Sequence, residues 1–282
     1  MTSLQTLIRH HGLTEQEDAI LGAVRSAVLL CLGEPDPTPT PGTSRIGGLP
    51  DLPPSLEWPL SAGGEALVFL LQLDLRDVPH FAGNPLPQRG MLFLFLGLDE
   101  PASDVEHRLL LYTGAETVAP RPRPDALTIN ENYDGLPSHR IEMLLVPDLP
   151  RWYSTTYEAL TGELSQEGQD RYEDLTRALH AGHGQGRTVV GQLFGHVTGI
   201  GHDAAEDAHI VRDVNPAWLY DSTKRATVDM TRAKTWRNLL RVNSVDELDL
   251  LFWDAGYLNV LIREADLEAL NLTETYAAVE TS

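Results

Sequence analysis

The sequence has one cysteine, Cys31, among its 282 residues. An intrachain disulfide therefore cannot form, and the lack of a cysteine framework favours a reducing compartment. No apolar run reaches the roughly 18–20 residues that a membrane-spanning helix needs, since the longest are Ala66–Leu73 and Met91–Leu98. The first residues show no basic region followed by an apolar segment, so we expect no secretory signal. These absences predict a cytoplasmic protein that does not enter a membrane.

Basic residues are also few. The chain has 21 Lys and Arg against 41 Asp and Glu, which gives a formal charge of −20 at pH 7. A field of this sign repels phosphate backbones, so we expect no nucleic-acid partner. It would attract a basic protein or a cationic ligand, although the charge could serve only to keep the protein in solution. With 42% apolar residues, the composition is typical of a folded globular protein.

Recognised catalytic motifs are missing as well. There is no G-x-S-x-G nucleophile motif, and the glycines of residues 195–201 are not followed by Gly-Lys-Ser/Thr. The histidines and acids of residues 180–183 and 202–209 have no recognised ligand spacing, so we predict no metal and no cofactor. Cys31 falls in an apolar pattern and is expected in the core. We therefore predict no catalytic residue.

The apolar patterns predict helices at two places and strands at several others. Residues 14–32 read as an amphipathic helix, because Thr14 and Glu17 form a capping-box pattern and apolar residues then recur at helical spacing as far as Cys31. Residues 154–181 read as a second helix. Strands are expected over 66–75, 91–98, 108–112, 141–146, 236–243 and 256–263, with a last one in the final ten residues. We therefore predict an α+β fold with mixed or antiparallel sheets and flanking helices.

A short internal similarity suggests how the chain is divided. The strand around Gln72 is followed 18 positions later by Gly90, which opens another apolar strand, and the strand around Arg241 is followed 15 positions later by Gly256. This pattern suggests two related α+β halves packed about a pseudo-twofold axis, although two strand pairs can also match by chance. We expect an N-terminal helix in residues 1–33 that packs on the body, a first half over 43–150 and a second over 151–282, all in one compact unit.

Two segments carry a family resemblance. Between Arg45 and Phe95 the chain reads R-I-G-G-L-P-D-L-P, E-W-P, G-G-E-A-L-V-F-L-L-Q-L-D-L and L-P-Q-R-G-M-L-F-L-F. Between Trp236 and Leu267 it reads W-R-N-L-L-R-V-N-S and F-W-D-A-G-Y-L-N-V-L-I-R-E-A-D-L. These segments resemble the YwqG-like family of bacterial domains of unknown function. The chain departs from the family at Arg241, where a glutamine is usual, and at residues 253–256, where W-G-D-x-G is usual.

The resemblance implies an α+β fold with two similar halves, and it implies no established activity. Some members of the family are encoded near bacterial toxin systems. The resemblance therefore implies, by association alone, an immunity or accessory role.

Polar and aromatic residues in these segments form the candidate site. Buried polar side chains need partners, so they either hold loops or shape a ligand site. In the first interpretation Arg45 faces a carboxylate, Gln72 faces backbone amides and the tryptophans lie in the core. In the second, Arg45 and Arg89 meet an anionic group in a cleft between the halves, where the tryptophans stack. The candidate ligand-binding residues are Arg45, Trp58, Gln72, Asp74, Arg89, Trp253 and Asp254.

These observations favour a noncatalytic binding or interaction protein. Its most specific form is an acidic, immunity-type inhibitor of a basic toxin, because charge of opposite sign speeds association. The alternative is a small-ligand-binding protein, or a hydrolase-type enzyme, that uses a cleft between the two halves.

Overall fold

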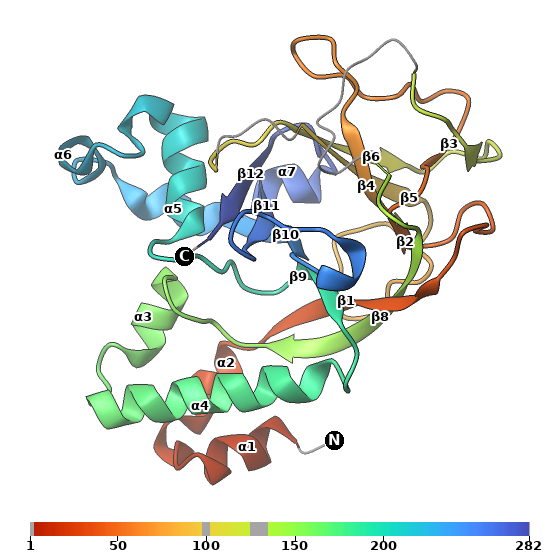
Figure 1. Ribbon diagram of the computed structural model, residues 1–282. Helices are drawn as coiled ribbons and strands as arrows, with labels where there is room; N and C mark the ends of the chain where they lie inside the picture. The colour runs from red at the N-terminus through yellow and green to blue at the C-terminus, as the bar shows by residue number, and fades with distance from the viewer. Residues whose placement is uncertain (1–2, 98–101, 125–134, 282) are drawn as a thin grey trace.

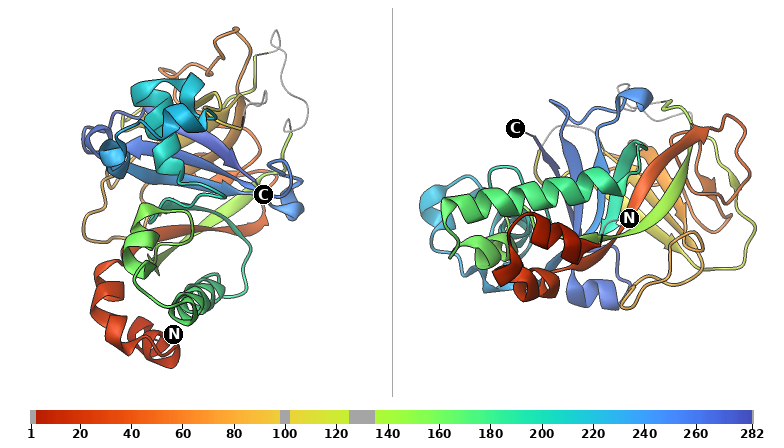
Figure 2. Two further views of the ribbon diagram at one scale, coloured as in Figure 1. Left: turned by 90° about the vertical axis from the view of Figure 1, so that its left-hand side faces the viewer. Right: turned by 90° about the horizontal axis from the view of Figure 1, so that it is seen from below.

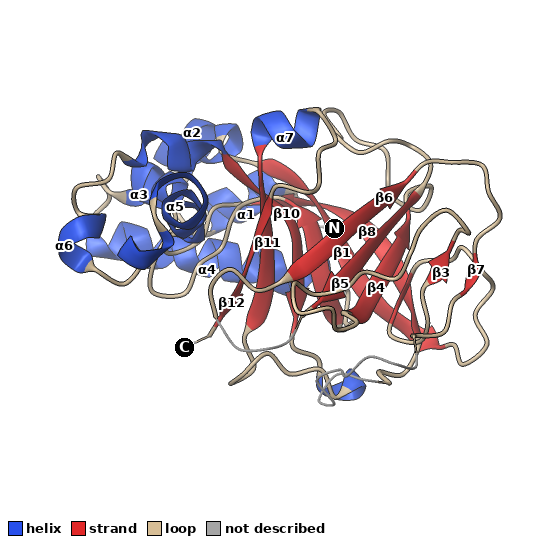
Figure 3. Cartoon of the chain, turned by 90° about the horizontal axis from the view of Figure 1, so that it is seen from above, coloured by secondary structure: helices blue, strands red, loops and turns tan. Residues whose placement is uncertain are grey.

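A computed structural model describes residues 3–97, 102–124 and 135–281. A large sheet dominates the chain, and most of the helices gather at one end of it (Figures 1 and 3). The strands of this sheet are β1 (Arg25–Pro35), β2 (Arg45–Ile46), β4 (Val68–Asp74), β5 (Met91–Leu96), β6 (His107–Tyr112), β8 (His139–Asp148), β9 (Val189–Phe194), β10 (Trp236–Asn243), β11 (Tyr257–Arg263) and β12 (Thr275–Glu280). Two short strands, β3 (Asp51–Leu52) and β7 (Ala119–Pro120), pair separately.

The strands of the large sheet follow the order β12-β11-β10-β9-β1-β8-β2-β4-β5-β6, and every pair is antiparallel. Strands β1 and β8 form the central pair. Along the chain, the next strand of this sheet after β1 is β2, and it pairs with β8. The next strand after β8 is β9, and it pairs with β1. From there each side continues outward in chain order. The strands on the two sides of the central pair are therefore connected in the same order.

The sheet curls until its two edges approach each other. The segment that leads into β6 runs alongside β12: the Val105 N–H donates to the Ala277 carbonyl over 2.8 Å, and the Val279 N–H donates to the Ala102 carbonyl over 2.7 Å. These bonds satisfy main-chain groups of β12 that an open edge would leave unpaired.

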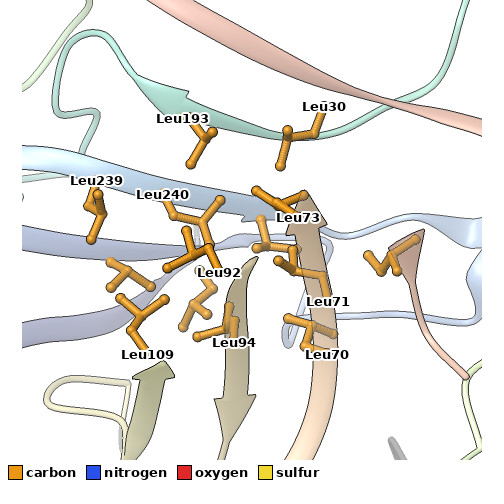
Figure 4. Close-up of a cluster of buried hydrophobic side chains, with 14 of the residues drawn as sticks. Leu30, Leu70, Leu71, Leu73, Leu92, Leu94, Leu109, Leu193, Leu239 and Leu240 are labelled. Atoms are coloured by element: carbon orange, nitrogen blue, oxygen red, sulfur yellow. The ribbon is translucent and has the colours of Figure 1, made fainter. Parts of the chain in front are cut away.

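A leucine-rich core fills the inside of the curled sheet. Leucines from the central pair and from both sides of it meet there, among them Leu30, Leu71, Leu92, Leu193 and Leu240 (Figure 4). Strands β4 and β5 are buried at every position, because a second cluster, built around Phe93, Phe95 and Trp58, covers their other face. Burial on both faces explains why these strands read as almost continuous apolar runs.

Among the described residues the helices are α1 (Leu4–His10), α2 (Glu17–Gly22), α3 (Thr155–Thr161), α4 (Gln166–His183), α5 (Ala204–His209), α6 (Ser222–Arg225) and α7 (Glu264–Glu268). Those labelled α1 to α4 lie at the lower left in Figure 1. The N-terminal helices α1 and α2 pack beside the long helix α4 (Figure 2), around the buried side chains of Ile8, Leu13 and Tyr172.

The predicted helix over residues 14–32 is wrong. A 3₁₀ turn over Thr14–Gln16 leads into α2, which ends at Gly22, and β1 then runs from Arg25 to Pro35 through the centre of the sheet. Within the region 1–33, α1 and α2 are helical and pack beside α4, and residues 25–33 belong to the central strand β1. The apolar run from Ala27 to Cys31 is buried between two layers, and such a run satisfies the spacing of a helix and of a strand alike. Cys31 is fully buried, as expected.

The other elements agree with the predictions more closely. The strands expected over 66–75, 108–112, 141–146, 236–243 and 256–263 are present, as is one at the C-terminus. The strand expected over 91–98 ends at Leu96, and Leu98 lies outside the described residues. The helix expected over 154–181 is divided into α3 and α4, because the Ser165 hydroxyl accepts a bond from the Gly168 N–H and starts a new helix. Helices with one large antiparallel sheet are consistent with the predicted α+β class.

Candidate functional site

Two of the candidate residues meet at a buried carboxylate. Arg45 on β2 lies opposite Gln72 on β4, and both contact the side chain of Asp51. Asp51 Oδ2 accepts from Arg45 Nη1 over 2.6 Å and from Gln72 Nε2 over 2.8 Å, and the Asp51 N–H donates to Gln72 Oε1 over 2.8 Å. Arg45 Nη2 also donates to the Leu49 carbonyl. These bonds hold the loop between β2 and β3 in place.

Trp58 and Asp74 also have structural partners. The Trp58 ring is buried against Phe95, and its Nε1–H donates to the Leu67 carbonyl over 2.8 Å. The Asp74 carboxylate is buried and pairs with Arg76 over 2.6 Å.

The remaining candidates, Arg89, Trp253 and Asp254, lie on the surface. Trp253 is 49% exposed, so the expectation that it is a core aromatic is wrong. The structure thus brings Arg45 and Gln72 together around Asp51. A ligand role for the seven residues stays a prediction.

A pocket of about 410 Å³ lies elsewhere, between the helices α3–α4, the loop after β9 and the start of β11. We call it the aromatic pocket. Its wall includes Arg151, Trp152, Tyr157, Glu173, Ile200 and Tyr257. All of its lining residues belong to the predicted second half, so it is not a cleft between the halves, and none of the seven candidates lines it.

Aromatic side chains form one wall of this pocket. Trp152 and Tyr153 are about half exposed, at 52% and 46%. The Trp152 Nε1–H donates to Glu173 Oε1 over 2.7 Å and lies 2.9 Å from Tyr157 Oη, which fixes the indole. Tyr153 has a φ of 57°, in the left-handed region that bulky residues rarely adopt. Exposed aromatic rings held in place beside a hollow are suited to stacking on a planar ligand.

An incompletely paired arginine, Arg241, lies behind the pocket wall and contacts two of the lining residues, Thr198 and Tyr257. The Arg241 guanidinium is 5.5 Å from the centre of the Tyr257 ring, and it donates to Thr198 Oγ1 over 3.3 Å and to Gln192 Oε1 over 3.2 Å. Both acceptors are neutral, and no carboxylate of the described residues is in ion-pair contact with it. Arg241 Nε and Tyr257 Oη are buried without an acceptor in the described part of the chain. Burial lowers the pKa of Arg241.

Asp148 lies close to this arginine but is bound to other groups. Its Oδ2 accepts from the His196 N–H over 2.7 Å and from Gln192 Nε2 over 3.3 Å. Burial raises the pKa of Asp148. His180 Nε2 lies 3.5 Å from Asp148 Oδ1, and burial lowers the pKa of His180 to about 3. His180 is therefore neutral at physiological pH and does not form a charged pair with Asp148.

A buried carboxylate holds the loop that forms the far wall of the pocket. Glu280 Oε2 accepts from the Ile200 N–H over 3.0 Å, and Asn259 Nδ2 donates to the Thr198 carbonyl over 2.6 Å. Burial raises the pKa of Glu280 to about 7. The strands β11 and β12 therefore position the main chain of this loop.

Two of the histidines singled out in the sequence pair with carboxylates. His202 pairs with Asp207, and His209 Nδ1 lies 2.8 Å from Asp213 Oδ2. Over residues 3–97, 102–124 and 135–281, no group of three or more His, Cys, Asp or Glu side chains is placed to bind a metal ion.

The comparisons with known proteins identify a family. Residues 44–280 match the model of a domain of unknown function, DUF1963. The match covers most of the chain, from the residue before β2 to the end of β12, and the protein belongs to this family. No curated protein matches the chain. Among the described helices, none has the length and apolar character needed to cross a bilayer.

Proposed function

We propose that this DUF1963 protein is a YwqG-like, noncatalytic binding protein that holds a small organic ligand in the aromatic pocket. One observation carries the proposal: the half-exposed rings of Trp152 and Tyr153 line the same pocket as Tyr257. The buried Oη of Tyr257 and the buried Nε of Arg241 behind it lack acceptors among the described residues. Small-molecule sites are typically hollows of about 300–1,000 Å³ with apolar walls and a few convergent polar groups. The left-handed backbone of Tyr153 adds support, because strained residues cluster at functional sites.

The titration behaviour of the groups near the pocket supports binding over acid–base catalysis. Burial lowers the pKa of His180 to about 3 and raises the pKa of Tyr257, so both side chains stay neutral near pH 7. A general acid or base works best when its pKa lies near the operating pH. Glu280 has such a pKa, but its carboxylate bonds to the Ile200 N–H and is not part of the pocket wall.

A variant that fills the pocket tests this function. We expect Ile200→Trp to place an indole in the hollow while keeping the Ile200 main-chain bond to Glu280. In a ligand-observed NMR screen of a small-molecule library, compounds that bind the parent protein should lose about tenfold or more in affinity for this variant.

The matched control is Leu60→Trp, which adds the same side chain at an exposed leucine outside the pocket. It should bind the same compounds as the parent protein. The proposal fails if no compound binds the parent, or if the Ile200→Trp variant binds them all equally well.

A second candidate function is a complex with a basic protein, such as a toxin that this chain inhibits. The formal charge of −20 supports it, because opposite charges steer association and raise its rate. A basic protein recovered with the chain from its native host should associate with it more slowly as salt concentration rises, because salt screens the attraction. A rate that does not change from low to high salt would exclude this steering.

A further inference from the structure

Each side of the sheet carries one arginine–glutamine pair at a corresponding place. On one side Arg45 of β2 lies opposite Gln72 of β4, and on the other Gln192 of β9 lies opposite Arg241 of β10. Strands β2 and β9 are the first strands outside the central pair, and β4 and β10 follow them. The two pairs thus occupy equivalent positions in the strand order.

A carboxylate completes the first pair. Asp51 Oδ2 accepts from Arg45 Nη1, from Gln72 Nε2 and from the Gly42 N–H, over 2.6, 2.8 and 2.7 Å. This single oxygen takes three donors and places a negative charge against the buried guanidinium. Buried arginines are normally paired in this way.

The arginine of the second pair has neutral acceptors where the arginine of the first has Asp51. Arg241 reaches Thr198 and Gln192 over 3.3 and 3.2 Å, both longer than the Arg45–Asp51 bond. Asp148 is engaged by the His196 N–H and by Gln192. The donors Arg241 Nε and Tyr257 Oη lack acceptors within the described ranges, and Tyr257 is part of the pocket wall.

The surroundings of Arg241 suit an acidic ligand with a ring. Arg151, in the pocket wall, is exposed and forms no ion pair with a described residue, so it adds a second positive charge. Glu173, the carboxylate of the wall, already accepts from Trp152 Nε1. Trp152 and Tyr153 offer half-exposed ring faces. The charge of these two arginines is opposite in sign to the formal charge of the whole chain, which is −20.

We propose that the aromatic pocket binds an aromatic carboxylate. The ligand carboxylate approaches Arg241, Tyr257 and Arg151, and so supplies to Arg241 the negative charge that Asp51 supplies to Arg45. The ligand ring stacks on Trp152 and Tyr153. This inference rests on the proposed function, since it names the class of ligand for the same pocket.

Equilibrium dialysis with three probes of one size tests the inference: 2-naphthoate, 2-naphthalenemethanol and 2-naphthylmethylammonium. The parent protein should bind 2-naphthoate about tenfold or more tightly than the alcohol, and bind the ammonium compound least. Arg241→Gln removes the charge but keeps a side chain able to bond with Thr198 and Gln192. It should bring the affinity for 2-naphthoate down to that for the alcohol.

Arg151→Gln, at an exposed position where folding is not at risk, should weaken 2-naphthoate binding in the same direction. The matched control is Arg171→Gln on α4, which removes an exposed arginine that pairs with Glu167 outside the pocket. It should leave all three affinities unchanged.

The outcomes separate this inference from the proposed function. The choice of a carboxylate is wrong if the parent binds 2-naphthoate and the alcohol equally well. It is also wrong if both the Arg241→Gln and Arg151→Gln variants keep the full affinity for 2-naphthoate. In either case the proposed function, a pocket that binds a small organic ligand, still stands. If the parent binds none of the probes while the library screen still finds ligands sensitive to Ile200→Trp, the inference alone is wrong. If that screen is also empty, both are wrong.

Discussion

Replacing Asp51 with alanine should destabilise the protein by about 3–5 kcal/mol, the usual effect of removing one partner of a buried ion pair. Asp51 is fully buried, Arg45 is 1% exposed, and the two are joined over 2.6 Å. Without Asp51 the guanidinium would stay buried and uncompensated, and Gln72 and the Gly42 N–H would lose an acceptor. Chemical denaturation of both proteins measures the difference.

The control for this variant is Asp254→Ala, which removes an exposed carboxylate from the same group of sequence candidates. A surface change of this kind should stay within about 0.5 kcal/mol of the parent. If Asp51→Ala is as stable as Asp254→Ala, then Arg45, Gln72 and Asp51 do not hold the loop as we describe.

Replacing Tyr172 with alanine should have an effect of similar size, about 3–5 kcal/mol, because it removes a buried aromatic side chain. The Tyr172 ring packs edge-on against Tyr157 with centroids 5.8 Å apart, inside the cluster that joins α1, α2 and α4. Its hydroxyl donates to the Pro150 carbonyl over 2.9 Å, directly before Arg151. We therefore expect ligand affinity to fall together with stability, since the same side chain anchors one wall of the pocket.

Tyr172→Phe separates these two contributions. It keeps the ring and removes the hydroxyl, so it should cost about 1 kcal/mol, the typical net value of one hydrogen bond. A Tyr172→Ala variant with the melting temperature of the parent would contradict the packing of α4 against the N-terminal helices.

The sequence predicts correctly those strands whose burial on both faces requires an almost continuous run of apolar residues. Strands β4 and β5 are covered on both faces, so nearly every position is apolar and the run is too short for a helix crossing a membrane. The sequence predicts a helix where β1 lies because the apolar run of β1 follows a helical start, and spacing alone does not show where a helix ends. The two neighbours of β1, β8 and β9, lie more than a hundred residues further along the chain, and they decide its conformation.

The aromatic pocket could not be predicted from the sequence, because it exists only where helices dock on the sheet. Gln192 and Arg241 are 49 residues apart, and neither their spacing nor the residues between them predicts that their side chains form a hydrogen bond. The departure at Arg241 from the glutamine implied by the family resemblance was the available signal. Another was the run Arg151-Trp152-Tyr153, three large side chains in front of the helix cap Ser154.

The candidate residues predicted from the sequence lie in turn-rich segments. The structure explains why a polar residue in such a segment resembles a ligand-binding residue. Arg45 and Gln72 are polar residues on strands that are otherwise buried, and they are tolerated there because Asp51 satisfies them. A buried polar network and a ligand site thus look alike in sequence. The two pairs differ in the bonding of the arginine: Asp51 bonds to both Arg45 and Gln72, whereas Asp148 bonds to Gln192 and not to Arg241.

Ligand binding at the aromatic pocket is tested most directly by a ¹⁹F NMR titration with 2-naphthoate of protein labelled with 5-fluorotryptophan. The chain has five tryptophans, and Trp152→Phe assigns the signal of the one in the pocket wall. We predict that the Trp152 signal shifts progressively with added 2-naphthoate while that of the buried Trp58 stays in place. A titration in which the Trp152 signal does not move would contradict ligand binding at this pocket.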